Sequence, residues 1–197
     1  MSDAAPKSSR KPRADALRNR AALIAAGQRV FSSGGPDTSL ETVAREAGVG
    51  IGTLYRHFPA RDDLFAAVYR QEVGELVALA RAEARGDDPV AALRRWMRAG
   101  VHLVATKRGM LAALGPMMDG PSAFFADMRA ALVRAVSDLL SAGVASGRVR
   151  ADVAADDVVR AFLGICYASD APGWQDTATH LLDIFTDGLR AGPDGRN

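Results

Sequence analysis

The sequence predicts an all-α protein in which a small N-terminal helical domain precedes a larger helical one. Apolar residues recur at spacings of three and four through most of the chain, which is the period of an amphipathic helix. The strict alternation that marks a half-buried strand is absent. Nearly half of the 197 residues are apolar and about a quarter are charged, which is typical of a folded globular protein.

The first predicted helix covers residues 15–33. Leu17, Ala21, Ile24 and Phe31 recur at helical spacing and are expected to form its buried face. A Gly-Gly-Pro run follows directly and is expected to end the helix.

Two short helices joined by a tight turn are predicted in residues 38–61. Thr38 and Glu41 have the spacing of a capping box, which favours a helix start there. Gly48 is expected to end this helix after two to three turns. A second helix is predicted over residues 53–58, so the segment has the layout of a helix-turn-helix.

The second helix of this pair has distinct inner and outer faces. Leu54 and Phe58 lie four residues apart and are expected to face the core. In a helix-turn-helix the second helix enters the major groove of DNA, where its outward side chains meet base edges and phosphates. The outward residues are Thr53, Tyr55, Arg56 and His57.

The stretch AREAGVGIGTLYRHFPARDDL resembles the signature of TetR-type transcriptional regulators. Gly50 and Ile51 depart from the pattern at positions where such proteins often carry a serine and a basic residue, which weakens local phosphate binding. Arg61 stands in the place of a frequent lysine and keeps its charge. The residues that match in register are Ala44, Ala47, Gly48, Val49, Gly52, Thr53, Leu54, Tyr55, His57 and Phe58.

Several residues are candidates for DNA contact. Thr53 is expected to meet a base edge or a phosphate, and Arg56 a guanine or a phosphate. Tyr55 is interpreted as a phosphate ligand, and the resemblance implies the same role for His57. Ser39 lies at a helix N-terminus, where backbone N–H groups also favour phosphate. The DNA-binding set is Ser39, Thr53, Tyr55, Arg56, His57 and Arg61.

Charge is distributed unevenly along the chain. Residues 1–61 carry ten basic and five acidic side chains, net +5, although the whole chain is only +2. The positive charge therefore coincides with the predicted DNA-binding domain. Residues 1–13 are polar and contain Lys7, Arg10, Lys11 and Arg13; we expect a disordered basic arm that is either solvated or in contact with DNA.

Other classes of protein fit less well. No run of about eighteen apolar residues and no signal-peptide pattern is present, which predicts a cytoplasmic protein without membrane association. Cys166 is the only cysteine, so an intramolecular disulfide or a cysteine-rich metal site is excluded. His57, His102 and His180 form no recognisable catalytic or metal-binding pattern. We expect neither an enzyme nor a cofactor.

The larger domain is predicted to contain six further helices, for a total of about nine. The first, at residues 62–85, links the DNA-binding domain to the body. The second, from residue 90, is expected to break at residues 106–109, with a short helical piece at 110–114 and a loop at a cavity mouth after it. The last three are predicted at residues 124–144, 156–169 and 174–189. The predicted domains are thus a basic arm at 1–13, a helix-turn-helix domain at 14–60, and an effector-binding and dimerisation domain at 61–192.

Aromatic, methionine and other side chains of the larger domain are candidates for a small-molecule pocket. Helical spacing does not distinguish a pocket from ordinary core, so a third to a half of them are expected to face a cavity. The principal candidates are Trp96, His102, Met117, Phe124, Met128, Phe162, Cys166 and Trp174, with Met110, Met118, Phe125 and Tyr167 as further members.

The final helix carries two apolar stripes, which is more apolar surface than one protomer usually covers. This predicts a homodimer interface that contains Phe162, Leu181, Ile184 and Phe185. The resemblance implies a repressor that binds a palindromic double-stranded DNA operator as a dimer and releases it when a small molecule enters the larger domain. The alternative is a DNA-binding regulator without an effector, controlled by a protein partner or by its abundance. A solidly packed body would favour the alternative, whereas an enclosed cavity would favour the sensor.

Overall fold

The computed structural model describes residues 10–33, 38–114 and 123–192, and within these ranges the chain forms eight α-helices and no β-strand. The predicted all-α fold is confirmed. Within the same ranges no helix is both long and apolar enough to cross a bilayer. The helices are α1 Arg10–Ser33, α2 Leu40–Glu46, α3 Ile51–His57, α4 Arg61–Glu83, α5 Pro89–Leu114, α6 Ala123–Ala145, α7 Ala155–Tyr167 and α8 Trp174–Asp187.

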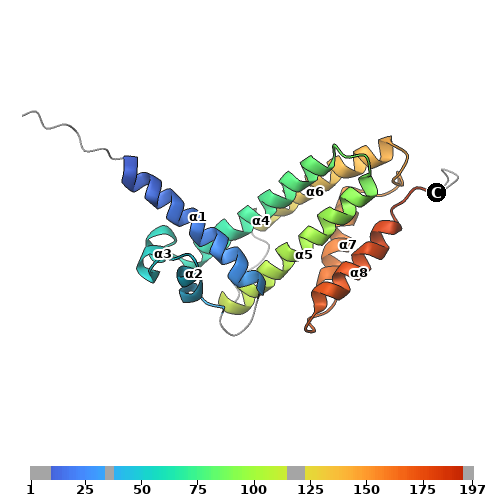
Figure 1. Cartoon of the computed structure of the whole chain (residues 1–197). Helices are drawn as coiled ribbons and strands as arrows, with labels where there is room; N and C mark the ends of the chain where they lie inside the picture. The colour runs from blue at the N-terminus through green and yellow to red at the C-terminus, as the bar shows by residue number, and fades with distance from the viewer. Residues whose placement is uncertain (1–9, 34–37, 115–122, 193–197) are drawn as a thin grey trace, which may run out of the picture.

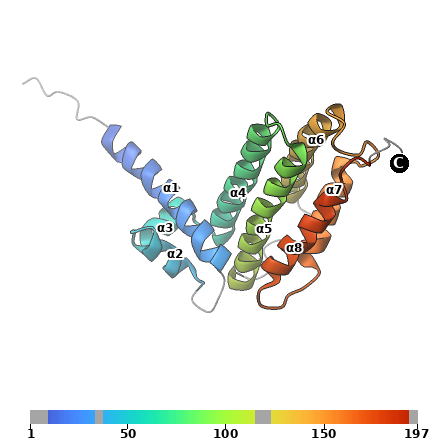
Figure 2. The same cartoon turned by 45° about the vertical axis from the view of Figure 1, so that its right-hand side comes forward.

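The helices form a small and a large group. Figure 1 shows α1, α2 and α3 gathered at one end of α4, while α4 to α8 form a bundle of long helices. In Figure 2 α4, α5 and α8 stand side by side, with α6 and α7 behind them. The helix α4 belongs to both groups, because it packs against α1 as well as against α5 and α6.

The start of the chain differs from the sequence prediction in two ways. The helix α1 begins at Arg10, so residues 10–13 are helical, whereas residues 1–9 of the expected arm lie outside the described part. The predicted buried face of α1 is confirmed for Phe31, which is fully buried, and for Ile24, which packs against the core, but it is wrong for Leu17, which is 66% exposed, and for Ala21, which is exposed. Figure 1 shows the first turns of α1 projecting beyond the bundle. The residues that pack inward are Leu23, Ala26, Val30 and Phe31.

The helix α5 is continuous where a break was predicted. Thr106 is fully buried, and its hydroxyl donates to the Glu72 carboxylate of α4 over 3.1 Å, so this polar residue is satisfied inside the helix. Gly109 lets α1 approach closely: a Cβ at this position would lie 1.8 Å from the Phe31 carbonyl oxygen. Tertiary contacts therefore explain why Thr106 and Gly109 occur within a continuous helix. The short piece predicted at residues 110–114 is the end of α5.

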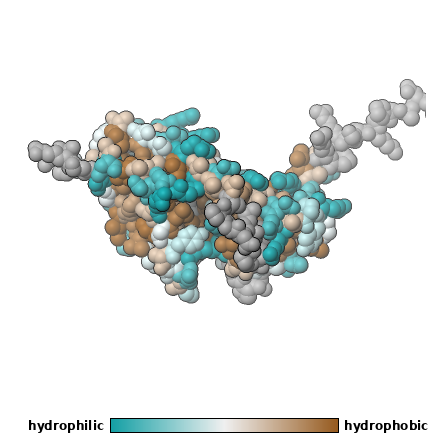
Figure 3. Space-filling model, turned by 180° about the vertical axis from the view of Figure 1, so that it is seen from behind, coloured by the Kyte–Doolittle hydropathy of each residue, from teal (hydrophilic) through white to brown (hydrophobic). Residues whose placement is uncertain are grey.

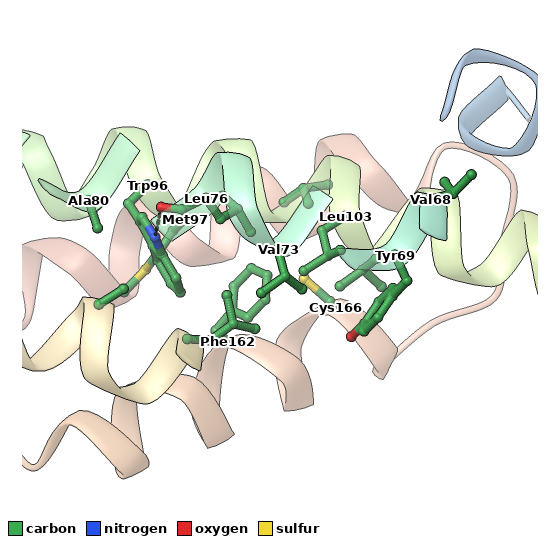
Figure 4. Packing of buried hydrophobic residues seen from close by; sticks show 14 of the residues in the cluster. Val68, Tyr69, Val73, Leu76, Ala80, Trp96, Met97, Leu103, Phe162 and Cys166 are labelled. Atoms are coloured by element: carbon green, nitrogen blue, oxygen red, sulfur yellow. Dashed lines mark hydrogen bonds between the residues drawn. The ribbon is translucent and has the colours of Figure 1, made fainter. Parts of the chain in front are cut away.

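The packed core runs along α4, α5 and α7. In Figure 4 the side chains of Val73 and Leu76 from α4 lie among Trp96 from α5 and Phe162 from α7. The Trp96 indole Nε1 donates to the Leu76 carbonyl over 3.1 Å, which satisfies its one polar atom. At the far end of the bundle, Arg150 N–H donates to the Leu189 carbonyl over 3.0 Å and joins the turn after α6 to the end of α8.

Candidate nucleic-acid interface and interior cavity

The helix pair α2 and α3 is positioned by local sequence signals and by two buried side chains. Gly48 has φ of +71°, a left-handed conformation that ends α2 and turns the chain toward α3. Leu54 and Phe58 are each 1% exposed, as predicted, and hold α3 against the small group of helices. The Arg20 guanidinium of α1 lies 5.1 Å from the centre of the Phe58 ring.

The start of α2 is capped by a different residue from the one predicted. Ser39 is the N-cap, and its Oγ accepts a hydrogen bond from the Thr42 backbone N–H over 3.1 Å. Thr38 therefore does not cap the helix. The Ser39 hydroxyl also donates to the Thr42 hydroxyl over 3.2 Å, so it serves the local structure of α2.

The outward face of α3 presents polar and charged groups to solvent. Tyr55 is 46% exposed and Arg56 is exposed, while Thr53 and His57 are half-buried. Arg56 donates to the Thr53 Oγ1 over 2.7 Å, which places a guanidinium beside the hydroxyl near the start of the helix. Arg61 is exposed at the start of α4, 3.6 Å from the Asp62 carboxylate.

Thr42 and Arg45 form a second polar pair, on α2, that the sequence analysis did not single out. Arg45 is an exposed cation on α2, and its guanidinium donates to the Thr42 Oγ1 over 3.3 Å. The pair has the same three-residue spacing as Thr53 and Arg56, which is the signal that identifies it. The start of α3 itself has no side-chain cap, because its N-cap is Gly50.

The larger group of helices contains a cavity of about 160 Å³ between α4, α5, α6 and α7, which is partly open to solvent and is called the interior cavity below. Its apolar lining consists of Leu103, Val104, Phe125, Leu132 and Leu163. Four polar residues complete the wall: Tyr69, Lys107, Arg129 and Tyr167. Phe125 and Tyr167 belong to the wider set of sequence candidates.

Three of the principal pocket candidates lie in the packed core and not in the lining of this cavity. Trp96, Phe162 and Cys166 are each at most 1% exposed, and Figure 4 shows them among the buried side chains of the bundle. The Trp96 and Phe162 rings lie 5.9 Å apart, centre to centre. Burial raises the pKa of the Cys166 thiol to about 12, so the thiol stays protonated at neutral pH.

The other candidates are dispersed. Phe124 and Met128 are half-buried on α6, and the Phe124 ring lies 6.0 Å from that of Tyr69. His102 is exposed, with its Nε2 3.6 Å from the Glu72 carboxylate. Trp174 lines an open groove, and the Arg108 guanidinium lies 4.3 Å from the centre of its ring. Met117 and Met118 are outside the described residues, and Met110 is fully buried.

The residues predicted to form the dimer interface differ in their exposure to solvent. Phe162 is 1% exposed and lies against Gly100 of the same protomer, so the prediction that it forms part of a dimer surface is wrong. Leu181 and Ile184 on α8 are 39% and 57% exposed, and Phe185 is half-buried. Figure 3 shows apolar residues gathered on the large group of helices, on the side opposite to that of Figure 1.

Comparison with protein families matches both parts of the chain. Residues 23–68 match the model for bacterial regulatory proteins of the tetR family. Residues 88–191, more than half of the chain, match the C-terminal domain of SbtR-like transcriptional regulators.

Solved structures and curated relatives agree with these matches. The chain is 38% identical to the TetR transcriptional regulator SCO0520 from Streptomyces coelicolor, covering 87% of this chain and 98% of that one with a TM-score of 0.72. It is 31% identical to the TetR transcription regulatory protein from Mycobacterium vanbaalenii, covering 90% and 98% with a TM-score of 0.68. The HTH-type regulator AcrR of Shigella flexneri is 35% identical over 89 residues.

The match to AcrR covers 43% of this chain and 41% of AcrR, and a similar regulator of Staphylococcus aureus is covered over 36% of its length. The similarity to these two relatives is therefore partial, whereas the two solved structures are similar over nearly their whole length. Together with the helix pair and its polar outer face, these matches show that the chain belongs to the TetR family of transcriptional regulators, which bind DNA through a helix-turn-helix.

Proposed function

We propose that this regulator is a repressor that binds a palindromic double-stranded DNA operator as a homodimer and releases it when a small molecule occupies the larger group of helices. It would act in the cytoplasm, where genomic DNA is accessible, and without a catalytic step. The observation that carries the DNA-binding part is the outward face of α3, where Thr53, Tyr55 and Arg56 lie over the buried Leu54 and Phe58.

The geometry of this face suits a division of roles. Thr53 lies in the first turn of α3, where side chains of a recognition helix meet base edges, and the Arg56 guanidinium from the last turn lies within hydrogen-bond distance of it. Tyr55 points away from the core and offers a hydroxyl to a phosphate. Arg45 and Arg61 add exposed positive charge on the neighbouring helices, which favours the DNA backbone.

The release step is supported by the position of α4. This helix begins at Arg61, shortly after the end of α3, and it carries Tyr69, which lines the interior cavity. A ligand that prefers a different position of α4 would change the spacing of the two recognition helices in a dimer and so weaken operator binding. The cavity favours this sensor over a regulator without an effector.

The test of DNA binding uses an operator selected from random double-stranded DNA. We expect an inverted repeat with half-site centres about one helical turn apart, or a multiple of it. Tyr55→Ala should weaken binding to all sequences alike, whereas Thr53→Ala should relax specificity at one position by about 1–3 kcal/mol. Fluorescence anisotropy at fixed salt measures both effects.

A matched control distinguishes a specific effect of the outward face of α3 from a general effect of losing one positive charge. Arg56→Ala should weaken operator binding, while Arg81→Ala, which removes an exposed cation from α4 far along the chain from α3, should leave it unchanged. Circular dichroism checks that each variant keeps its helices. A folded Tyr55→Ala protein with full operator affinity would contradict the proposed role of α3.

A further inference from the structure

The wall of the interior cavity carries a positive charge that lacks a partner among the described residues. Lys107 lies on α5 and is half-buried at the cavity. Its ammonium lies 4.7 Å from the centre of the Phe125 ring and 5.9 Å from that of Tyr69, so aromatic faces are its neighbours. Burial alone lowers the pKa of this ammonium, and in the described part of the chain no carboxylate stands within ion-pair distance to oppose that effect.

The second cation of the wall is already neutralised. The Arg129 guanidinium lies 2.5 Å from the Asp156 carboxylate, which also accepts from Arg160 over 2.6 Å. The arginine pair holds the pKa of Asp156 below its ordinary value, so this carboxylate stays ionised. Lys107 is therefore the charge in this wall that a bound group can still match.

The rest of the wall is apolar and aromatic. Phe125 packs edge-on against Tyr69, with ring centres 5.6 Å apart, and Leu103, Leu132 and Leu163 complete the lining. The cavity volume of about 160 Å³ is close to the roughly 150 Å³ of an apolar cavity that holds a benzene molecule. Its size and lining therefore suit one aromatic ring.

We propose that the cavity binds a small aromatic carboxylate, with the ring in the apolar part and the carboxylate paired with the Lys107 ammonium. This inference rests on the proposed effector-released function and names the chemical class of the effector. A monoanion fits better than a phosphate, because a phosphate carries more charge than one ammonium matches and prefers the bidentate fork of an arginine. A cation is disfavoured by the ammonium of Lys107.

The binding test compares ligands of one shape and three charges. Benzoate, benzamide and benzamidinium are titrated into the full chain by isothermal calorimetry, and phenylacetate and 3-phenylpropionate are compared with their amides. We expect at least one carboxylate to bind roughly ten- to a hundredfold more tightly than its amide, the range for a hydrogen bond to a charged group. Benzamidinium should bind least. If no carboxylate binds better than its amide, the inference is wrong.

Variants test the role of Lys107. Lys107→Met keeps the length of the side chain and removes its charge, so it should abolish the preference for the carboxylate while still admitting the amide. Arg70→Met is the matched control, because Arg70 is a cation on the same aromatic cluster, 4.9 Å from the centre of Phe124, and lies outside the cavity lining. Lys107→Arg should retain a preference for carboxylates. An unchanged preference in a folded Lys107→Met protein would overturn the assignment.

Operator affinity measured with and without the carboxylate separates the proposed ligand class from the proposed function of the regulator. A carboxylate that binds through Lys107 but leaves operator affinity unchanged supports the ligand class and contradicts the release step. An operator that is bound normally by a protein without any carboxylate preference supports the DNA-binding part and overturns the ligand class.

Discussion

Glu72 is a buried ionisable residue of α4, only 4% exposed, with several polar neighbours. Its carboxylate accepts from the Thr106 hydroxyl and lies 3.6 Å from the His102 Nε2, both on α5, while Glu75 of the same helix adds a like charge. Burial outweighs the three favourable neighbours, His102, Thr106 and Gln28, so the pKa of Glu72 is raised above the ordinary 4.5. The residue therefore makes the stability of the fold depend on pH.

The direction of this dependence follows from proton binding. Between pH 4.5 and the raised folded-state pKa, the folded chain binds more protons at Glu72 than the unfolded chain does, so the free energy of unfolding falls as pH rises through that window. Glu72→Gln should remove this slope and unfold at higher urea concentration than the natural protein at neutral pH. Glu75→Gln removes the neighbouring like charge, so it should lower the folded-state pKa of Glu72 and narrow this window without abolishing the slope. Urea unfolding at a series of pH values checks the result, and an unchanged slope in Glu72→Gln would contradict the assignment.

At the scale of elements, the contact between α1 and α5 joins the DNA-binding helices to the body. Gly109 of α5 lies directly against the backbone of Phe31 in α1, and Gly27 of α1 faces the side chain of Val68 in α4. Glycine is required at Gly109 because the neighbouring atoms are backbone, which no rotamer change can move. The two glycines hold α1 against α5 and α4, which are two of the four helices that line the cavity.

Two alanine substitutions test this contact. Gly109→Ala should lower the free energy of unfolding by roughly 1–3 kcal/mol, since the added methyl group overpacks the joint. Gly74→Ala is the control, because Gly74 is exposed on α4 and a methyl group added there would meet no atom within 4 Å. It should stabilise the protein by about 0.5–1 kcal/mol through helix propensity. Equal urea midpoints for the two variants would show that α1 does not pack against α5 as closely as the structure has it.

At the scale of the whole molecule, the exposed apolar residues of α8 are the basis for the proposed homodimer. Leu181 and Ile184 are exposed on this helix, three residues apart, so they share one face. A two-fold dimer would use this face on both protomers and present two α3 helices to the two half-sites of an operator. Dimerisation and operator affinity should therefore be lost together.

Lysine substitutions at this face test the dimer. The double variant Leu181→Lys and Ile184→Lys should sediment as a monomer at micromolar concentration and lose operator binding, because it places four like charges in a two-fold interface. Val144→Lys changes an apolar residue on α6 that is as exposed as Leu181, and this variant should remain a dimer. Analytical ultracentrifugation distinguishes these outcomes, and a dimeric double variant would exclude α8 as the interface.

The sequence by itself determined the features that depend on neighbouring residues in the chain. Leu54 and Phe58 face inward because helical spacing puts them on one side, and Gly48 ends α2 because glycine readily adopts a positive φ. The outward position of Tyr55 and Arg56 follows from the same spacing. These local rules were sufficient for the fold class and for the predicted DNA-binding face.

Only the tertiary structure decided which partner each helical face meets. Leu17 has the right spacing for a core position but is 66% exposed, and Phe162 was predicted at the dimer interface but packs inside its own protomer. Thr106 is tolerated within α5 because a carboxylate from another helix accepts its hydrogen bond. The position of Lys107 beside an apolar cavity depends in the same way on α4, α6 and α7. Helical periodicity defines the faces of a helix, whereas burial depends on contacts between residues far apart in the chain, which no local pattern records.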